Sequence, residues 1–152
     1  MFSTRSPELT MADGGVTFAR LSATPITLDE CSAAVAVEQA GAIVTFAGIV
    51  RDQDGGRSVR SLDYEAHPSA SDVIAGVAVS VAFDFPGVRI AVVHRIGGLG
   101  IGELALACAV SSAHRAEAFA ACTRLVDEVK QRVPIWKQQH FTDGTSEWVG
   151  SL

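Results

Sequence analysis

The sequence predicts an α+β fold in which helices pack on a largely antiparallel sheet. The chain has 152 residues, the size of one domain. Its hydrophobic fraction of 48% against a charged fraction of 19% allows a full core and excludes a disordered chain. The apolar pattern alternates between helix and strand spacing without an internal repeat. The resulting order is helix, two strands, helix, two strands, helix and hairpin.

The N-terminal part predicts a lead-in, a helix and a strand. Residues 1–22 are polar and poorly patterned, so we expect a flexible lead-in and a single domain over residues 23–152. Thr27 and Glu30 form a capping box, which predicts a helix over about 28–39 that ends at Gly41. The nearly continuous apolar run 42–50 predicts a buried strand, followed by a polar loop over 51–56.

The central part predicts two strands with a helix between them, and then a third strand. Residues 59–65 alternate between apolar and polar, as a half-buried strand does, and His67-Pro68 ends this strand. Ser69 or Ser71 is placed to cap a helix over about 72–83, which Pro86-Gly87 closes. Strands are expected over 88–95 and 103–110, with the glycine-rich stretch 97–102 as the turn between them.

The C-terminal part predicts a long helix and a hairpin. Apolar residues recur at helical spacing over about 113–132, with Ser111-Ser112 as the expected cap and Pro134 as the stop. Residues 135–141 and 147–149 predict a hairpin that turns at Asp143-Gly144.

Composition excludes several classes of protein. The net charge of −5 argues against a general nucleic-acid binder, although a local pocket can still bind a small anion. No stretch has the apolar length needed to cross a membrane, so no membrane association is expected. The three cysteines are odd in number and lack a C-x-x-C spacing, which argues against a disulfide framework and a zinc site. We therefore expect a reducing, cytoplasmic setting and small core thiols.

The basic residues are the strongest candidates for chemistry. The chain holds 12 lysines and arginines, and the only lysines are Lys130 and Lys137. Lysine, unlike arginine, can shift its pKa and act as an acid, a base or a nucleophile. Arg51 follows a predicted strand, and His114 and Arg115 begin the long helix, whose free amides favour anions. Each also has a purely structural interpretation. Lys130 can complement the dipole of the helix near its end, Arg51 can be a solvated loop residue, and His114 can be a residue that starts the helix.

The long helix sets a geometric constraint on these candidates. Arg115 and Lys130 are 15 residues apart on it, which is about 22 Å at roughly 1.5 Å per residue. One small ligand cannot contact both on the same chain. Either the two ends serve different sites, or two copies of the chain share one site across a dimer interface.

The remaining candidates are weaker. The glycine-rich stretch 97–102 lacks the Gly-Lys-Ser/Thr of a P-loop and precedes a strand instead of a helix. Asp52 and Asp54 are typical turn residues. The histidines His67, His94 and His140 have no spacing that a metal site requires. No metal is therefore expected.

Taken together, these residues make the chain resemble the large, catalytic subunit of molybdopterin synthase. The resemblance extends over residues 26–149 and rests on order and spacing, since no single motif is decisive. The matching segments are Gly41-Ala42-Ile43-Val44-Thr45-Phe46-Ala47-Gly48-Ile49-Val50-Arg51, Leu62-Asp63-Tyr64-Glu65-Ala66, Val93-His94-Arg95-Ile96-Gly97, Gly102-Glu103, Ser112-Ala113-His114-Arg115-Ala116-Glu117-Ala118-Phe119 and Lys130-Gln131-Arg132-Val133-Pro134-Ile135-Trp136-Lys137.

The resemblance implies a fold, an activity and partners. The fold would be an α/β-hammerhead-type sandwich, with 23–152 as the catalytic domain. Such enzymes convert cyclic pyranopterin monophosphate (precursor Z) to molybdopterin by inserting two sulfurs. The sulfur comes from the C-terminal thiocarboxylate of a ubiquitin-like small subunit, so no nucleophilic cysteine and no cofactor are expected in this chain. The family forms a heterotetramer around a homodimer of the large subunit.

The resemblance also implies roles for individual residues. Lys130 and Lys137 match the catalytic lysines. Arg51, His114 and Arg115 match positions that bind the substrate phosphate, and Phe46 is placed to line the substrate pocket or the core. These positions in the family form a site across the large-subunit dimer.

Two features depart from the family pattern. Gln139 stands where the family often has glutamate, and the chain ends at Leu152, where relatives often have a longer tail. These departures leave an alternative open, in which the chain is a non-catalytic homologue that only binds the ubiquitin-like small subunit. A stand-alone anion-binding protein is a third alternative. The apolar residues Ile135 and Trp136 of the hairpin favour a docking surface over this third class.

Overall fold

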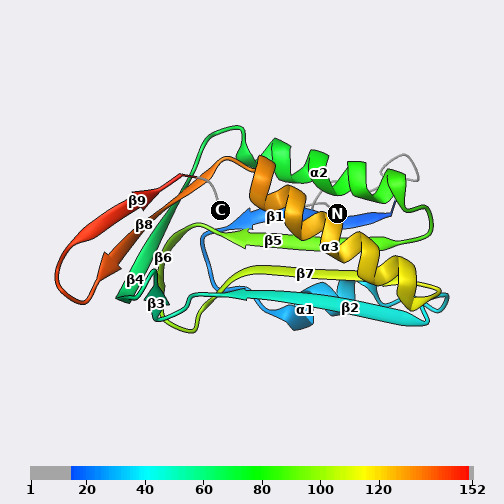
Figure 1. Cartoon of the computed structure of the whole chain (residues 1–152). Helices are drawn as coiled ribbons and strands as arrows, with labels where there is room; N and C mark the ends of the chain where they lie inside the picture. The colour runs from blue at the N-terminus through cyan, green and yellow to red at the C-terminus, as the bar shows by residue number, and fades with distance from the viewer. Residues whose placement is uncertain (1–14, 151–152) are drawn as a thin grey trace.

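The structure is a computed structural model that describes residues 15–150, and it has the predicted α+β architecture (Figure 1). Within these residues, three helices accompany two β-sheets. The helices are α1 (Leu28–Val35), α2 (Ala70–Asp84) and α3 (Arg115–Arg132). The strands are β1 (Val16–Ser22), β2 (Ala42–Ile49), β3 (Gln53–Asp54), β4 (Arg57–Ala66), β5 (Arg89–Arg95), β6 (Gly97–Gly100), β7 (Leu104–Ser112), β8 (Ile135–Phe141) and β9 (Ser146–Val149).

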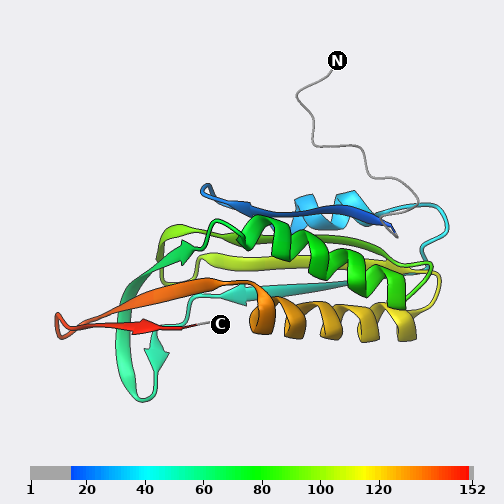
Figure 2. The ribbon, with the colours of Figure 1, turned by 90° about the horizontal axis from the view of Figure 1, so that it is seen from above.

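The first sheet has the order β1-β5-β7-β2 and forms the middle layer of the molecule. Only the β1–β5 pair is parallel within it. Figures 1 and 2 show α2 and α3 over one face and α1 on the other. Successive residues of a strand face opposite sides. Ile90 and Val92 of β5 therefore join the core under α2 and α3, while Ala91 and Val93 join the core under α1.

The second sheet extends from one end of the first (Figure 2). Its long strand β4 pairs antiparallel with β3, β6 and β8, and β8 pairs with β9 in the C-terminal hairpin. Gly55 and Gly56 both have positive φ, so they can form the tight turn between β3 and β4. The end of β2 lies next to strands β4 and β8 of this second sheet.

Most of the predicted elements are confirmed. Both hydrogen bonds of the capping box are present, between the Thr27 side chain and the Glu30 backbone and between the Glu30 side chain and the Thr27 backbone. Ile26 and Cys31, on either side of the box, pack in the same core cluster. The helix ends at Val35, earlier than expected, because Ala36 is already extended. The second helix begins after Ser69, whose side chain makes no cap hydrogen bond, and the hairpin β8–β9 is confirmed.

The N-terminal expectation is wrong where the structure describes it. The predicted flexible lead-in over 1–22 contains strand β1 from Val16 to Ser22, which pairs with β5. The strand lies at the edge of the sheet and only Val16 is fully buried, so its residues lack a clean alternation. The part of the lead-in over 1–14 lies outside the described residues.

Four further local expectations are corrected. Strand β2 is not a buried strand: it is the other edge of the sheet, none of its residues is fully buried, and Ile43 and Ile49 are exposed. The polar loop 51–56 and the glycine-rich turn 97–102 contain the short strands β3 and β6, both paired with β4. Ser111-Ser112 is the end of β7 and does not cap α3, whose N-cap is His114.

The three cysteines are buried and unpaired, as expected for core thiols. Burial raises the pKa of Cys31 to about 11 and raises the pKa of Cys108 and Cys122 as well, so none is activated as a nucleophile. Across residues 15–150 no helix has the length and apolar character needed to span a membrane.

Candidate active site

A small pocket of about 80 Å³ lies where the end of β2 meets the β4–β8 sheet. Lys137 and Gln139 enter it from β8, and Tyr64 enters it from β4. Residues two apart on a strand share a face, and Tyr64 is the register partner of Lys137, so these side chains converge. Arg51 reaches the same pocket from the segment after β2. The structure therefore brings together two of the predicted site residues, Arg51 and Lys137.

One wall of the pocket is held by a buried amide. Gln139 is 2% exposed, and its side-chain Nε2 donates a hydrogen bond of 2.8 Å to Oδ2 of Asp54 on β3. Asp54 also lines the pocket. The carboxylate accepts from the amide, so the pair is satisfied without a positive charge. Arg51, the exposed cation of the pocket, remains available for an anion.

Lys130 lies in the last turn of α3 and is not one of the residues that line this pocket. Its positive charge acts on His94 of β5, which is 2% exposed. The His94 ring packs edge-on against Tyr64, with 4.9 Å between the ring centres. Tyr64 thus contacts His94 with its ring and lies opposite Lys137 in the strand pairing. Burial raises the pKa of the Tyr64 hydroxyl.

His94 is held as a neutral ring. Burial lowers the pKa of His94 to about 4, and the charge of Lys130 lowers it further, while the hydrogen bond to the Arg95 carbonyl opposes the shift. Its Nδ1 lies 2.6 Å from that carbonyl oxygen. A carbonyl only accepts hydrogen bonds, so Nδ1 carries the proton and Nε2 presents a lone pair.

His114 and Arg115 lie at the opposite end of α3 from Lys130. His114 is the N-cap with extended backbone and Arg115 is the first helical residue, and both are exposed. Because α3 is continuous from Arg115 to Arg132, the separation of about 22 Å expected at roughly 1.5 Å per residue holds. Within one chain the structure does not bring these two residues to the pocket of Arg51 and Lys137.

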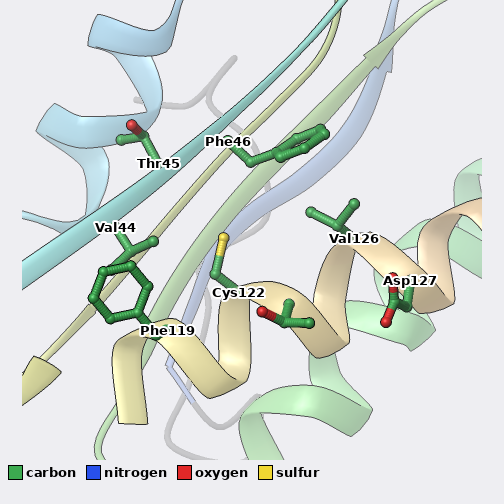
Figure 3. Close-up of a pocket in the computed structure, with 8 residues that line it drawn as sticks. Val44, Thr45, Phe46, Phe119, Cys122, Val126 and Asp127 are labelled. Carbon is green, nitrogen blue, oxygen red and sulfur yellow. The ribbon is translucent and has the colours of Figure 1, made fainter. Parts of the chain in front are cut away.

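Phe46 lines a different, apolar pocket of about 300 Å³ between β2 and α3. Figure 3 shows its ring in this space with Cys122 and Val126 of the helix. Phe46 also packs against the main core cluster. Phe46 therefore both lines an apolar pocket and packs on the core, and its ring lies outside the pocket of Arg51 and Lys137. A contact of Phe46 with substrate stays a prediction.

Sequence reasoning missed three residues of this region. Asp54 was interpreted as a turn residue, although its carboxylate holds Gln139. Tyr64 is the single tyrosine of the chain, and its place opposite Lys137 needed the strand register. His94 was weighed only as a metal ligand, and its packing against Tyr64 was missed. In residues 15–150 no group of three or more histidine, cysteine, aspartate or glutamate side chains could hold a metal ion.

Comparisons with known proteins agree with this fold. The sequence model of the MoaE protein family matches residues 21–132. The molybdopterin synthase catalytic subunit 1 of Mycobacterium tuberculosis is 40% identical over 141 residues, which cover 92% of this chain and 95% of that protein. The molybdopterin synthase catalytic subunit of Nostoc sp. is 40% identical over 127 residues, covering 82% and 77% of the two chains.

Solved structures agree as well. The molybdopterin synthase from Staphylococcus aureus matches with a TM-score of 0.82 and 34% identity, covering 87% of this chain and 96% of that one. A structure from Helicobacter pylori, described as a complex of subunits 1 and 2 of molybdopterin-converting factor, shares the fold with a TM-score of 0.60 and 20% identity. It covers 80% of this chain and 76% of that one. The match of the family model over 21–132, together with these relatives, shows that the chain belongs to the MoaE protein family.

Proposed function

We propose that this chain is the catalytic subunit of a molybdopterin synthase and that the pocket of Arg51 and Lys137 is part of its active site. The observation that carries the proposal is this pocket, in which Arg51 and Lys137 meet beside the buried Tyr64. The enzyme transfers sulfur in molybdenum cofactor biosynthesis. Its substrate is the cyclic pterin phosphate precursor Z, and the sulfur arrives as a thiocarboxylate on a ubiquitin-like small subunit.

The chemistry of the residues supports specific roles. Arg51 is exposed at the pocket and carries a permanent charge that suits a phosphate. Lys137 supplies an amine inside the pocket, where it can donate or accept a proton as sulfur replaces oxygen on the pterin. Lys130 supplies a second amine from α3, whose charge acts on His94.

The size of the pocket supports a site completed by other chains. Its volume of about 80 Å³ is well below the roughly 300 Å³ at which pockets for small ligands begin. The tail of the small subunit and the His114-Arg115 end of a second copy are the partners we propose. A homodimer would place the start of one α3 near the pocket of the other copy, which resolves the separation of about 22 Å at roughly 1.5 Å per residue.

An activity assay tests the proposal directly. The purified protein is mixed with precursor Z and a thiocarboxylated small subunit, and molybdopterin is followed as its fluorescent oxidation product. We expect product from the wild type and a loss of about tenfold or more for Lys130→Ala and for Lys137→Ala. No product from the wild type, with the small subunit still bound, would make the chain a binding homologue instead of an enzyme.

Mixed dimers test the shared site. Lys137→Ala and Arg115→Ala are each inactive in the proposal, but a mixed dimer of the two contains one site in which both residues are intact. Random mixing makes half of the dimers mixed and half of their sites intact, so about a quarter of the wild-type activity should return. If each site lies within one chain, mixing restores nothing.

The proposal includes a cytoplasmic location. Three buried, unpaired cysteines suit a reducing compartment. Fractionation of cells with an antibody against the chain tests this part, and recovery from an oxidising compartment would contradict it.

A further inference from the structure

The segment that carries Arg51 crosses the pocket between fixed points. The backbone of Val50 is held on both sides, since its N–H donates to Glu103 and its carbonyl accepts from Gly102, at 3.0 and 2.9 Å. The carbonyl of Asp52 accepts from Val59 at 2.8 Å. These bonds tie the segment to β4 and to the residues before β7. They do not tie it to β8, which carries Lys137.

The hydrogen bond between Gln139 and Asp54 supplies that connection. In the part of the chain that the structure describes, it is the only side-chain hydrogen bond between residues 49–56 and β8. Gln139 is 2% exposed and faces the same side of β8 as Lys137. The bond therefore spans the pocket from the strand of Lys137 to the hairpin that follows Arg51.

We propose that Gln139 and Asp54 are positioning residues of the active site, whose hydrogen bond sets the place of Arg51 relative to Lys137. This inference rests on the proposed function of the pocket. Neither residue needs to touch the substrate. An amide–carboxylate bond is charge-assisted and among the stronger hydrogen bonds in proteins, so it can hold a two-residue strand that pairs only with β4.

The same geometry explains why this chain does not use glutamate at position 139. A second carboxylate at 2.8 Å from Asp54 would remove the amide donor, and the two carboxylates would repel each other unless they shared a proton. Glutamate at this position therefore needs a partner that donates. The glutamine is a matched half of a pair, and it is not a loss of catalytic charge.

A swap of donor and acceptor tests the pair. Gln139→Glu and Asp54→Asn each break the match, whereas the double variant rebuilds one amide–carboxylate bond in the reverse direction. At pH 8 we expect kcat/KM to fall about tenfold or more in Gln139→Glu, and to return to within about threefold of the wild type in the double variant. Gln138→Glu is the matched control, because this substitution adds the same charge on the opposite face of β8.

The pH profile separates positioning from a general structural defect. The charged and titratable groups around the pair are Arg51, Tyr64 and Lys137 in the pocket, Arg57 opposite Asp54, and Glu147 opposite Gln139. All of them are unchanged in every variant. In Gln139→Glu alone, activity relative to the wild type should rise as the pH falls toward about 5, because a protonated glutamate can donate to Asp54.

The outcomes are distinct. An inactive wild type refutes the proposed function and with it this inference. An active wild type with Gln139→Glu unimpaired, or with no rescue in the double variant, refutes the positioning role alone. If Gln139→Glu does not fold, Asp54→Ala replaces it, since Asp54 is only partly buried. We then expect a higher KM for precursor Z, measured well below the unfolding midpoint of the variant, and an unchanged KM would overturn the inference.

Discussion

Lowering the pH should destabilise this protein through His94. Burial holds the pKa of His94 at about 4 in the folded chain, against about 6.5 for an exposed histidine in the unfolded chain. Between these values the unfolded state binds more protons than the folded state, so stability falls as the pH falls. The contribution is fully present above about pH 6.5 and is lost progressively toward pH 4.

The size of this effect follows from the shift. A difference of about 2.5 pKa units at 1.36 kcal/mol each gives about 3 kcal/mol of unfolding free energy lost between pH 7 and pH 4. Carboxylates act in the same direction at the acid end: hydrogen bonds from Arg124 and from Thr145 lower the pKa of Glu128 and of Asp143, so the stability that these groups contribute is lost as the pH falls. A reference variant must therefore remove His94 alone.

His94→Asn is that reference. Its side-chain amide can donate to the Arg95 carbonyl as the Nδ1 proton of His94 does, and it does not titrate. Urea denaturation at fixed protein concentration and ionic strength measures both proteins from pH 7 to pH 4. The wild type should lose about 3 kcal/mol more than the variant over this range. If the unfolding free energies of the two proteins fell by the same amount between pH 7 and pH 4, the neutral, buried state that we assign to His94 would be refuted.

Three other predictions follow from the structure. Thr27→Ala removes the acceptor for the Glu30 N–H and should lower the unfolding free energy by about 1 kcal/mol in urea denaturation. Gly41→Ala places a Cβ 2.4 Å from the Ala113 carbonyl oxygen and should destabilise by roughly 1–3 kcal/mol, whereas Gly76→Ala, in open space on α2, should be neutral or stabilise by up to about 1 kcal/mol. Equal effects at the two glycines would contradict the packing. In an alignment of the family, relatives with glutamate at position 139 should carry a hydrogen-bond donor at position 54, and a carboxylate at both positions would count against the pair.

Elements with strong local signals were predictable from the sequence. The capping box at Thr27 and the proline after α3 act through a few neighbouring residues, so they place helix ends without tertiary information. Strand β1 was not predictable in this way. It is an edge strand with one fully buried residue, and its place depends on pairing with β5, which lies far along the chain.

The candidate site shows the same division. The basic residues could be named from the sequence because lysine is rare in this chain. Their arrangement could not, because it depends on strand register: β8 against β4 places Lys137 opposite Tyr64. The Asp54–Gln139 bond joins residues 85 positions apart, and no local pattern marks such a pair.

The environment of His94 has a consequence for the two lysines. Lys130 and Lys137 reach the region from a helix and from a strand on either side of Pro134, so their side chains approach the wall of Tyr64 and His94 from different elements. A protonated His94 would add a positive charge that repels the positive charge of Lys130. Burial prevents this, because it keeps the ring neutral at physiological pH. The burial of His94 thus keeps a second positive charge away from the amine of Lys130 and out of the core.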